Sequence, residues 1–236
     1  GEVVVAAADG GDLPAIAEAH GVVPLPPYIR RPSTAVGAAE RARRDRERYQ
    51  TVYARADAVG GGGSVAAPTA GLHFDASMLE RLAVRGVTLA SVRLHVGPGT
   101  FKPPSDEQLV SGRLHPEVFH LPAATGAAVA GCRARGGRVI AVGTTSLRVL
   151  ATVSALDLPS TPVPGEERRF PAGGAPPPVF DGVARATAGG WDVRGTTRLF
   201  LRPPAAVTCA DGLLTNFHLP GSSLLMLVAA FGGETL

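Results

Sequence analysis

The order of apolar and polar positions divides the chain into short helices and strands that alternate along the sequence. Apolar residues at helical spacing follow Asp75, a good N-cap, and stop at Gly86, a typical helix-ending residue. Short apolar runs without that spacing predict strands. We expect helices at Leu13–His20, Glu40–Arg55, Ala76–Arg85, Thr125–Arg135, Thr145–Val153 and Ser223–Phe231, and strands at Val3–Ala7, Val87–Val96, Arg138–Val142, Arg198–Leu201 and Leu213–Phe217.

Three stretches rich in proline or glycine interrupt this alternation. Pro24–Ile29 is expected to run extended across the surface, and Gly60–Gly63 to be a flexible break. Leu158–Trp191 is predicted to be a long loop or a partly ordered insertion. Because strands and helices otherwise alternate over short connections, the pattern favours an α/β class, a mixed α/β layered domain from about residue 24 to 236.

Composition narrows the class of protein. The chain has 236 residues, 45% of them hydrophobic, which is enough to bury a sizeable core. Its net charge is +3, and Lys102 is the one lysine among 23 basic residues, a bias typical of GC-rich codon usage. Cys132 and Cys209 match no metal or redox spacing and are expected to be reduced thiols. No run has membrane-spanning length and no signal peptide is visible, so we expect a cytoplasmic protein with no membrane partner.

Two runs of small and polar residues around a histidine are the first candidates for chemistry. Ala66–Phe74 and Leu214–Pro220 both contain little bulk, which lets a ligand approach the backbone closely. We interpret them as two walls of one pocket, with core histidines as the alternative. The candidate residues are Pro68, Thr69, Gly71, His73 and Phe74 in the first run, and Thr215, Asn216 and His218 in the second.

A third candidate is Val142–Arg148, where a predicted strand leads into a predicted helix. Free backbone N–H groups and hydroxyls at a helix N-terminus form a site for a carboxylate or phosphate. Simple N-capping by Thr144 or Thr145 is the alternative. The run lacks the lysine and glycine spacing of a P-loop. Its candidate residues are Gly143, Thr144, Thr145 and Arg148.

Two further histidines lie beside groups that suit a site. His115 and Glu117 are two residues apart and would face the same side of an extended chain, where the carboxylate could orient the imidazole as a general base. A solvated His–Glu pair is the alternative. His95 ends a predicted strand before a glycine turn, or is an ordinary surface histidine. The turn adds the candidates Gly97, Gly99, Thr100 and Phe101. No zinc-type spacing links the histidines, so no metal is expected.

The predicted helix Glu40–Arg55 is rich in arginine and could contact RNA phosphates. It also carries Glu40, Asp45 and Glu47, so internal ion pairs explain the same pattern. A solvated face is the simpler interpretation.

Together these strings resemble the S-adenosylmethionine:tRNA ribosyltransferase-isomerase family of queuosine biosynthesis. The similarity follows the family's order over nearly the whole chain. The matching stretches are Pro24–Ile29, Arg48–Tyr53, Gly63–Phe74, Leu94–Phe101, His115–Glu117, Val139–Arg148, Leu214–Pro220 and Ser223–Phe231.

The resemblance implies that the ribosyl part of S-adenosylmethionine moves to the aminomethyl group of a 7-deazaguanine at the wobble position of tRNA. Rearrangement gives epoxyqueuosine and releases adenine and methionine. S-adenosylmethionine is then a consumed donor, and no metal or bound cofactor is expected. His73, His115 or His218 could remove the proton next to the sulfonium, and Phe74, Phe101 or Glu117 could face that sulfonium. The methionine carboxylate could bind at Gly143–Thr145 with Arg148.

The chain also departs from the family pattern. The family's small β-barrel domain is largely missing, so residues 1–23 are expected to be the end of that domain and a linker. Ala151-Thr152 and Thr197-Arg198 stand where the family usually has an acidic residue, and Leu158–Trp191 is longer than typical. A non-tRNA 7-deazapurine or amine acceptor, or a non-catalytic RNA- or nucleotide-binding relative, are therefore alternatives. A monomer is expected.

Overall fold

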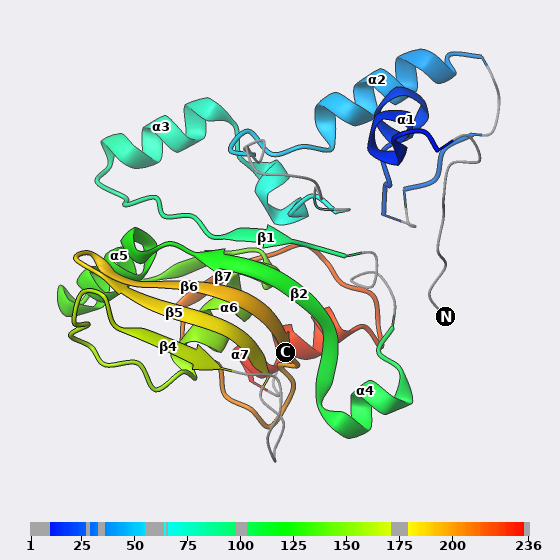
Figure 1. The fold of residues 1–236 in the computed structure, drawn as a ribbon. Helices are drawn as coiled ribbons and strands as arrows, with labels where there is room; N and C mark the ends of the chain where they lie inside the picture. Colours follow the sequence, from blue (N-terminus) through cyan, green and yellow to red (C-terminus); the bar gives the residue numbers. More distant parts are fainter. Residues whose placement is uncertain are drawn as a thin grey trace.

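The computed structural model describes residues 10–26, 29–32, 36–54, 64, 66–97, 103–170 and 179–233. The strands form a mixed architecture of two sheets with helices against them, as the sequence predicted (Figure 1). In order, the elements are α1 (Leu13–His20), α2 (Ala38–Arg48), the 3₁₀ turn η1 (Thr69–His73), α3 (Ala76–Val84), β1 (Arg93–His95), α4 (Asp106–Ser111), β2 (Arg113–Leu121), α5 (Ala123–Ala134), β3 (Ile140–Val142), α6 (Thr144–Ser154), β4 (Glu167–Phe170), β5 (Phe180–Thr187), β6 (Gly190–Leu199), β7 (Gly212–Leu214) and α7 (Ser223–Gly232).

The larger sheet has five antiparallel strands in the order β1-β2-β6-β5-β4. Helices α5 and α6 pack against β6, and α6 contributes Val149 to the core on that face. Alternation along the strands supplies this core: Phe119 and Leu121 on β2 are buried, while Val118 between them is half exposed. The core cluster consists of Phe119, Leu121, Val149, Phe180, Ala184, Ala186, Trp191 and Val193.

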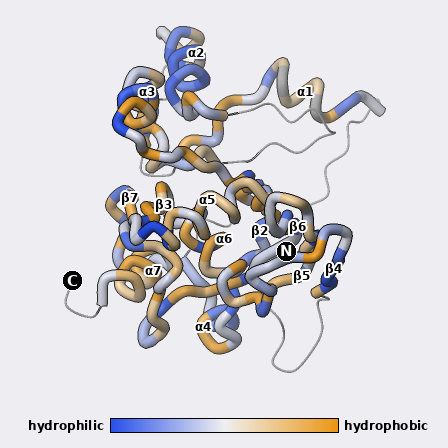
Figure 2. Tube along the Cα trace, turned by 90° about the vertical axis from the view of Figure 1, so that its left-hand side faces the viewer, coloured by the Kyte–Doolittle hydropathy of each residue, from blue (hydrophilic) through white to orange (hydrophobic). Residues whose placement is uncertain are grey.

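The smaller sheet pairs β3 with β7 in parallel, and a second core cluster lies beside it. That cluster joins α6 to α7, a helix that is apolar throughout and appears orange in Figure 2. Leu147 belongs to this second cluster and Val149 to the first, and both side chains are fully buried. Helix α6 is therefore held from two sides, and Arg148 lies between its two anchoring residues.

The segments before β1 form a separate group of helices beyond the sheet (Figures 1 and 2). Helix α2 is strongly hydrophilic and has no buried residue, and ion pairs link Arg43 to Glu40 and Arg31 to Asp45. These pairs account for part of its charge pattern, as the solvated-face interpretation expects. Within the described residues, no helix combines the length and apolarity needed to cross a bilayer.

Most of the predicted helices are confirmed to within a few residues. Asp75 caps α3 by accepting a hydrogen bond from the Met78 N–H at 2.6 Å. The predicted helix at 40–55 is wrong at its C-terminal end, because α2 stops at Arg48 and Tyr49 leaves helical geometry to become buried. Pro26 in the proline-rich run is fully buried, not on the surface. The predictions at 3–7 and 60–63 lie outside the described residues.

The strand predictions were less accurate. The strand expected at 87–96 shrinks to β1, that at 198–201 is the end of the longer β6, and that at 213–217 stops at Leu214. The long loop expected at 158–191 is wrong, because this stretch contains β4 and β5 and the core residues Phe180 and Trp191. The alternative, a partly ordered insertion, stays a prediction. Helix α4 and strand β2 were not predicted.

Candidate active site

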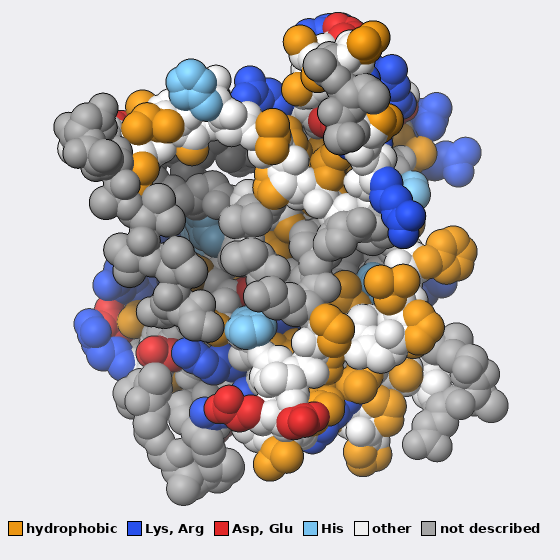
Figure 3. Space-filling view, turned by 90° about the vertical axis from the view of Figure 1, so that its right-hand side faces the viewer, with side chains coloured by type: hydrophobic (Ala, Val, Ile, Leu, Met, Phe, Trp, Pro, Cys, Tyr) orange, Lys and Arg blue, Asp and Glu red, His pale blue; other side chains and the backbone are white. Residues whose placement is uncertain are grey.

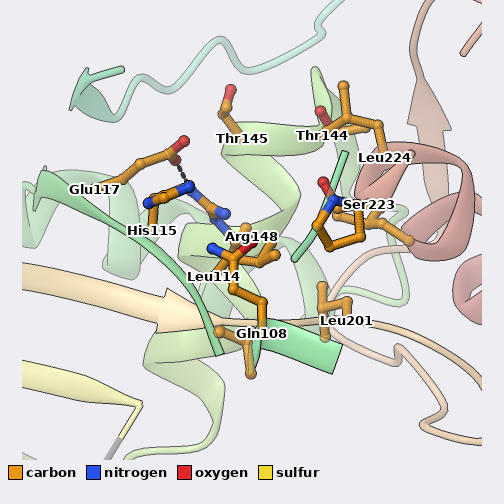
Figure 4. A pocket seen from close by; sticks show the side chains of 13 residues that line it. Gln108, Leu114, His115, Glu117, Thr144, Thr145, Arg148, Leu201, Ser223 and Leu224 are labelled. Atoms are coloured by element: carbon orange, nitrogen blue, oxygen red, sulfur yellow. Dashed lines mark ion pairs between the residues drawn. The ribbon is translucent and has the colours of Figure 1, made fainter. Parts of the chain in front are cut away.

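A pocket opens where β2, α4, α6 and α7 meet, beyond the end of β6 (Figure 4). Its cavity volume is about 30 Å³, enough for water but not for a large ligand. The side chains that line the cavity come from these elements and the segments beside them. They are Pro104, Gln108, Leu114, His115, Glu117, Thr144, Thr145, Arg148, Leu199, Leu201, Ser223, Leu224 and Leu227.

An ion pair between Glu117 on β2 and Arg148 on α6 lies in this pocket (Figure 4). The side chains are only 6% and 8% exposed, so both charges are removed from water. Burial lowers the pKa of Arg148 to about 10, which still leaves the guanidinium charged at neutral pH. Its Nε is buried and has no hydrogen-bond partner within the described part of the chain. A buried cation with a spare donor is costly unless a ligand supplies the missing acceptor.

The start of α6 forms one wall of the pocket through Thr144 and Thr145. Gly143 precedes them with φ 92°, a conformation that side chains rarely adopt, and this lets the chain turn sharply from β3 into the helix. Gly143 is itself the N-cap, and no side chain caps the helix. Capping by Thr144 or Thr145 is therefore wrong. The N-terminal end of α6 therefore lines the pocket, and its N-cap residue offers no side chain to the first N–H groups.

Beneath the ion pair, two buried hydroxyls join α6 to β6. Thr152 Oγ1 donates to the Arg148 carbonyl at 2.8 Å and lies 2.7 Å from Thr197 Oγ1. Because the Thr152 hydroxyl gives its one proton to that carbonyl, the Thr197 hydroxyl is the donor in the bond between the two threonines. Thr197 Oγ1 also accepts a hydrogen bond from the Leu199 N–H at 3.2 Å. Thr197 is also the cross-strand neighbour of Glu117. One small network thus fixes both partners of the ion pair.

His115 lines the pocket beside Glu117, although its side chain is exposed and that of Glu117 is buried. The pairing register of β2 shifts between Arg113 and Glu117. Pro116 lies inside this irregularity, where a residue without an N–H is tolerated. Both residues thus line the same pocket, and the role of each stays a prediction.

The two small-residue runs meet each other, as expected, but beside this pocket instead of in it. His73 Nε2 lies 2.8 Å from Asn216 Oδ1, and Thr215 Oγ1 lies 2.9 Å from His218 Nε2. Burial lowers the pKa of His218. The Gly143 N–H donates to the Leu214 carbonyl at 2.9 Å, so this second cluster adjoins the start of α6.

The small residues of η1 serve packing more than ligand approach. A side chain at Gly71 would overlap the Tyr53 hydroxyl, which fills the space beside the backbone. Pro68 precedes η1, Thr69 begins it, and Phe74 follows it half buried. None of these residues lines the pocket at Glu117.

The turn after β1 is only partly visible. His95 pairs across the sheet with Val118, and the next residue, Val96, donates its N–H to Ser64 Oγ at 3.0 Å. Gly97 follows and is partly buried, and a Cβ there would meet no atom of the described residues within 4 Å. The candidates Gly99, Thr100 and Phe101 lie outside the described residues. His95 and Gly97 do not line the pocket at Glu117.

Several lining residues were missed by sequence reasoning. Gln108 follows Ser105 at the spacing of a capping box, and that signal predicts α4 without predicting a pocket. Ser223 and Leu224 begin α7, which Ser222 caps. The remaining residues, Pro104, Leu114, Leu199, Leu201 and Leu227, are ordinary apolar positions that only the tertiary fold brings here. Among the described residues, no three His, Cys, Asp or Glu side chains are placed to hold a metal ion.

The family model for queuosine biosynthesis proteins matches residues 1–236. An S-adenosylmethionine:tRNA ribosyltransferase-isomerase of Acidithiobacillus ferrooxidans is 49% identical over 226 residues, covering 96% of this chain and 52% of that protein. One from Anaeromyxobacter sp. is 45% identical over 231 residues, covering 98% and 54%. A crystal structure of S-adenosylmethionine tRNA ribosyltransferase from Thermotoga maritima matches with a TM-score of 0.47 and 33% identity, over 70% of this chain and 42% of that one.

The chain thus spans about half the length of the curated relatives it matches. Those relatives bear the name of an enzyme, and the resemblance drawn from the motifs is confirmed. Because the family model covers every residue of the sequence, this chain belongs to the queuosine biosynthesis protein family.

Proposed function

We propose that this protein transfers and isomerises the ribosyl group of S-adenosylmethionine onto the aminomethyl group of 7-aminomethyl-7-deazaguanine in tRNA, giving epoxyqueuosine. The observation that carries the proposal is the buried Glu117–Arg148 pair, which lies against the uncapped start of α6. Family membership supports the reaction, since the relatives are named for it.

The charges of the pocket match those of the methionine end of the donor. A carboxylate fits Arg148, whose Nε lacks a hydrogen-bond partner within the described residues, and the N–H groups at Thr144 and Thr145. The ammonium and sulfonium cations fit the carboxylate of Glu117. Because Glu117 and Arg148 pair with each other inside a small pocket, S-adenosylmethionine binds by separating the two side chains. The Glu117–Arg148 ion pair is then replaced by one pair between Arg148 and the donor's carboxylate and one between Glu117 and its cationic groups.

Among the three candidate histidines, His115 lines the pocket, and we assign to it the removal of the proton next to the sulfonium. The proton passes to the imidazole, and the electron pair remains on carbon, where the adjacent sulfur stabilises it. His73 and His218 lie in the neighbouring cluster, where they can protonate the departing adenine. The donor is consumed, and no resident cofactor takes part in this proposal.

The test measures adenine and methionine release by mass spectrometry, with S-adenosylmethionine and tRNA that carries the 7-aminomethyl base. Arg148→Gln is expected to raise the KM for S-adenosylmethionine at least about tenfold, because a charged hydrogen bond is lost. Arg194→Gln removes an exposed arginine paired with Asp192 and should leave the KM unchanged.

The assignment of the base is tested separately. His115→Ala should lower the rate of adenine release by about 10²–10⁴-fold, the usual contribution of a general base. Equal rates for wild type and His115→Ala would contradict that role. Absence of adenine release with tRNA, and its presence with the free 7-deazapurine, would contradict the tRNA acceptor.

A further inference from the structure

One aromatic side chain near the candidate site has no role in the fold. Phe217 is 104% exposed, although a phenylalanine is stabilised by burial by about 1.5–3 kcal/mol. Exposed apolar side chains lie near imidazoles on one face of the molecule (Figure 3), and in the sequence His218 directly follows Phe217. This exposure leaves the face of the ring open to a ligand.

The loop that carries Phe217 is braced on both sides of the ring. Asn216 Oδ1 is hydrogen-bonded to His73 Nε2, and His218 Nε2 to Thr215 Oγ1. Leu214 just before the loop accepts the N–H of Gly143 at the start of α6. The ring is therefore held out by residues on either side that are fixed in place, and its position is tied to the pocket wall.

The groups around the ring are those that recognise a nucleobase. An aromatic face stacks on a base, and amide and imidazole groups bond to its edge. Asn216 and His218, the two sequence neighbours of Phe217, supply such groups. His73 supplies another through its hydrogen bond to Asn216. Enzymes that modify a base in RNA must display that base outside its stack.

We propose that Phe217 is the stacking platform for the acceptor base, a purine-type base displayed from the single-stranded part of the RNA. This deepens the proposed function and rests on its tRNA acceptor. The base of the donor nucleoside is the other purine that could lie there. We favour the acceptor because Phe217 is outside the pocket at Glu117, on open surface that a macromolecule can reach.

The experiment compares Phe217→Ala, Phe217→Trp and the control Leu219→Ala, which removes an exposed apolar side chain two residues away. Loss of one stacked base predicts a rise of about 5- to 150-fold in the KM for tRNA with Phe217→Ala, equivalent to about 1–3 kcal/mol. Phe217→Trp should retain tRNA affinity. The affinity for S-adenosylmethionine should not change in any variant.

A second readout separates this inference from the proposed reaction. The Kd of each variant for an anticodon stem-loop carrying the 7-aminomethyl base is measured by fluorescence anisotropy, without turnover. Weaker binding by Phe217→Ala alone supports the inference even if no adenine is released. An unchanged Kd of Phe217→Ala for the stem-loop would overturn the inference. So would weaker binding of S-adenosylmethionine by Phe217→Ala.

Discussion

The pocket at Glu117–Arg148 and the loop at 215–218 carry similar polar groups, yet the fold treats them in opposite ways. The first pair is buried between two core clusters, and the second group projects Phe217 into solvent. In the pocket, a charge and its surroundings are fixed by the same packing that stabilises the domain. In the loop, local hydrogen bonds fix the shape and the core is hardly involved.

This difference separates two kinds of substitution. A change in the pocket affects stability and activity together, because each polar group there also satisfies a buried partner. A change at the exposed ring affects recognition alone. Measurements of stability and activity on the same variants therefore distinguish the two regions.

The largest effect is expected from Glu117→Gln, which leaves the guanidinium of Arg148 buried without its counter-charge. Breaking a buried pair from one side costs about 3–5 kcal/mol, seen as a lower midpoint in urea unfolding. The matched control is Glu167→Gln on β4, where a half-exposed carboxylate pairs with Arg169 and Arg185. Because these two ion pairs are exposed to solvent, the midpoint should shift far less than with Glu117→Gln.

The double variant Glu117→Gln/Arg148→Met sharpens the point. It removes both charges, so the free energy of unfolding should recover towards that of the wild type while activity stays lost. If the double variant were less stable than Glu117→Gln, the cost would come from packing and not from an uncompensated charge.

The next effect concerns the two hydroxyls below the pair. Thr152→Val removes the donor to the Arg148 carbonyl and the acceptor of Thr197, and we expect a loss of about 1–3 kcal/mol by urea unfolding. Thr152→Ser keeps the hydroxyl and should lose less. Thr152→Val with Thr197→Val should cost less than the two single changes added together, because the buried partners are removed as a pair. Additive costs would show that the hydroxyls do not act as one network.

The accuracy of the sequence predictions follows the same division between local and distant causes. Helix α3 is marked by its Asp75 cap, α1 by the glycine that follows it, and α6 by the strand that it follows, so local chemistry was enough to predict them. Candidates His115 and Glu117 were found from their two-residue spacing, and Thr144, Thr145 and Arg148 from a run in which a predicted strand leads into a predicted helix. Their convergence in one pocket is a property of the tertiary fold.

Strand β5 was missed because the glycines of β5 and of its partner β6 resemble turn signals. Gly182 and Gly195 lie opposite each other on β5 and β6, and a Cβ on either would come within 2.6 Å of the Phe180 ring. The glycines there make room for a core aromatic ring. Strand β4 has charged side chains on an edge of the sheet, where hydrophobic alternation is weak. No local pattern contains this information.

The smallest effect should come from His218, which is less buried than the Glu117–Arg148 pair and more buried than Phe217. Burial lowers its pKa below the ordinary value of 6.5, so the folded protein binds the proton less readily than the unfolded chain. The stability that depends on the neutral imidazole is fully present above that value. It is lost as the pH falls from 6.5 towards the lowered pKa of the folded state, and it stays constant below that.

The measurement is Tm between pH 8 and pH 5 for wild type, His218→Gln and the control His20→Gln, an exposed residue at the end of α1. All three lose stability as carboxylates titrate, so the informative quantity is the difference from wild type. We expect His218→Gln to lose less between pH 7 and pH 5 than wild type, and His20→Gln to follow wild type. If the Tm of His218→Gln and of wild type changed identically with pH, the Thr215–His218 hydrogen bond would compensate for the burial of the imidazole. His218 would then behave like the exposed residues of its loop.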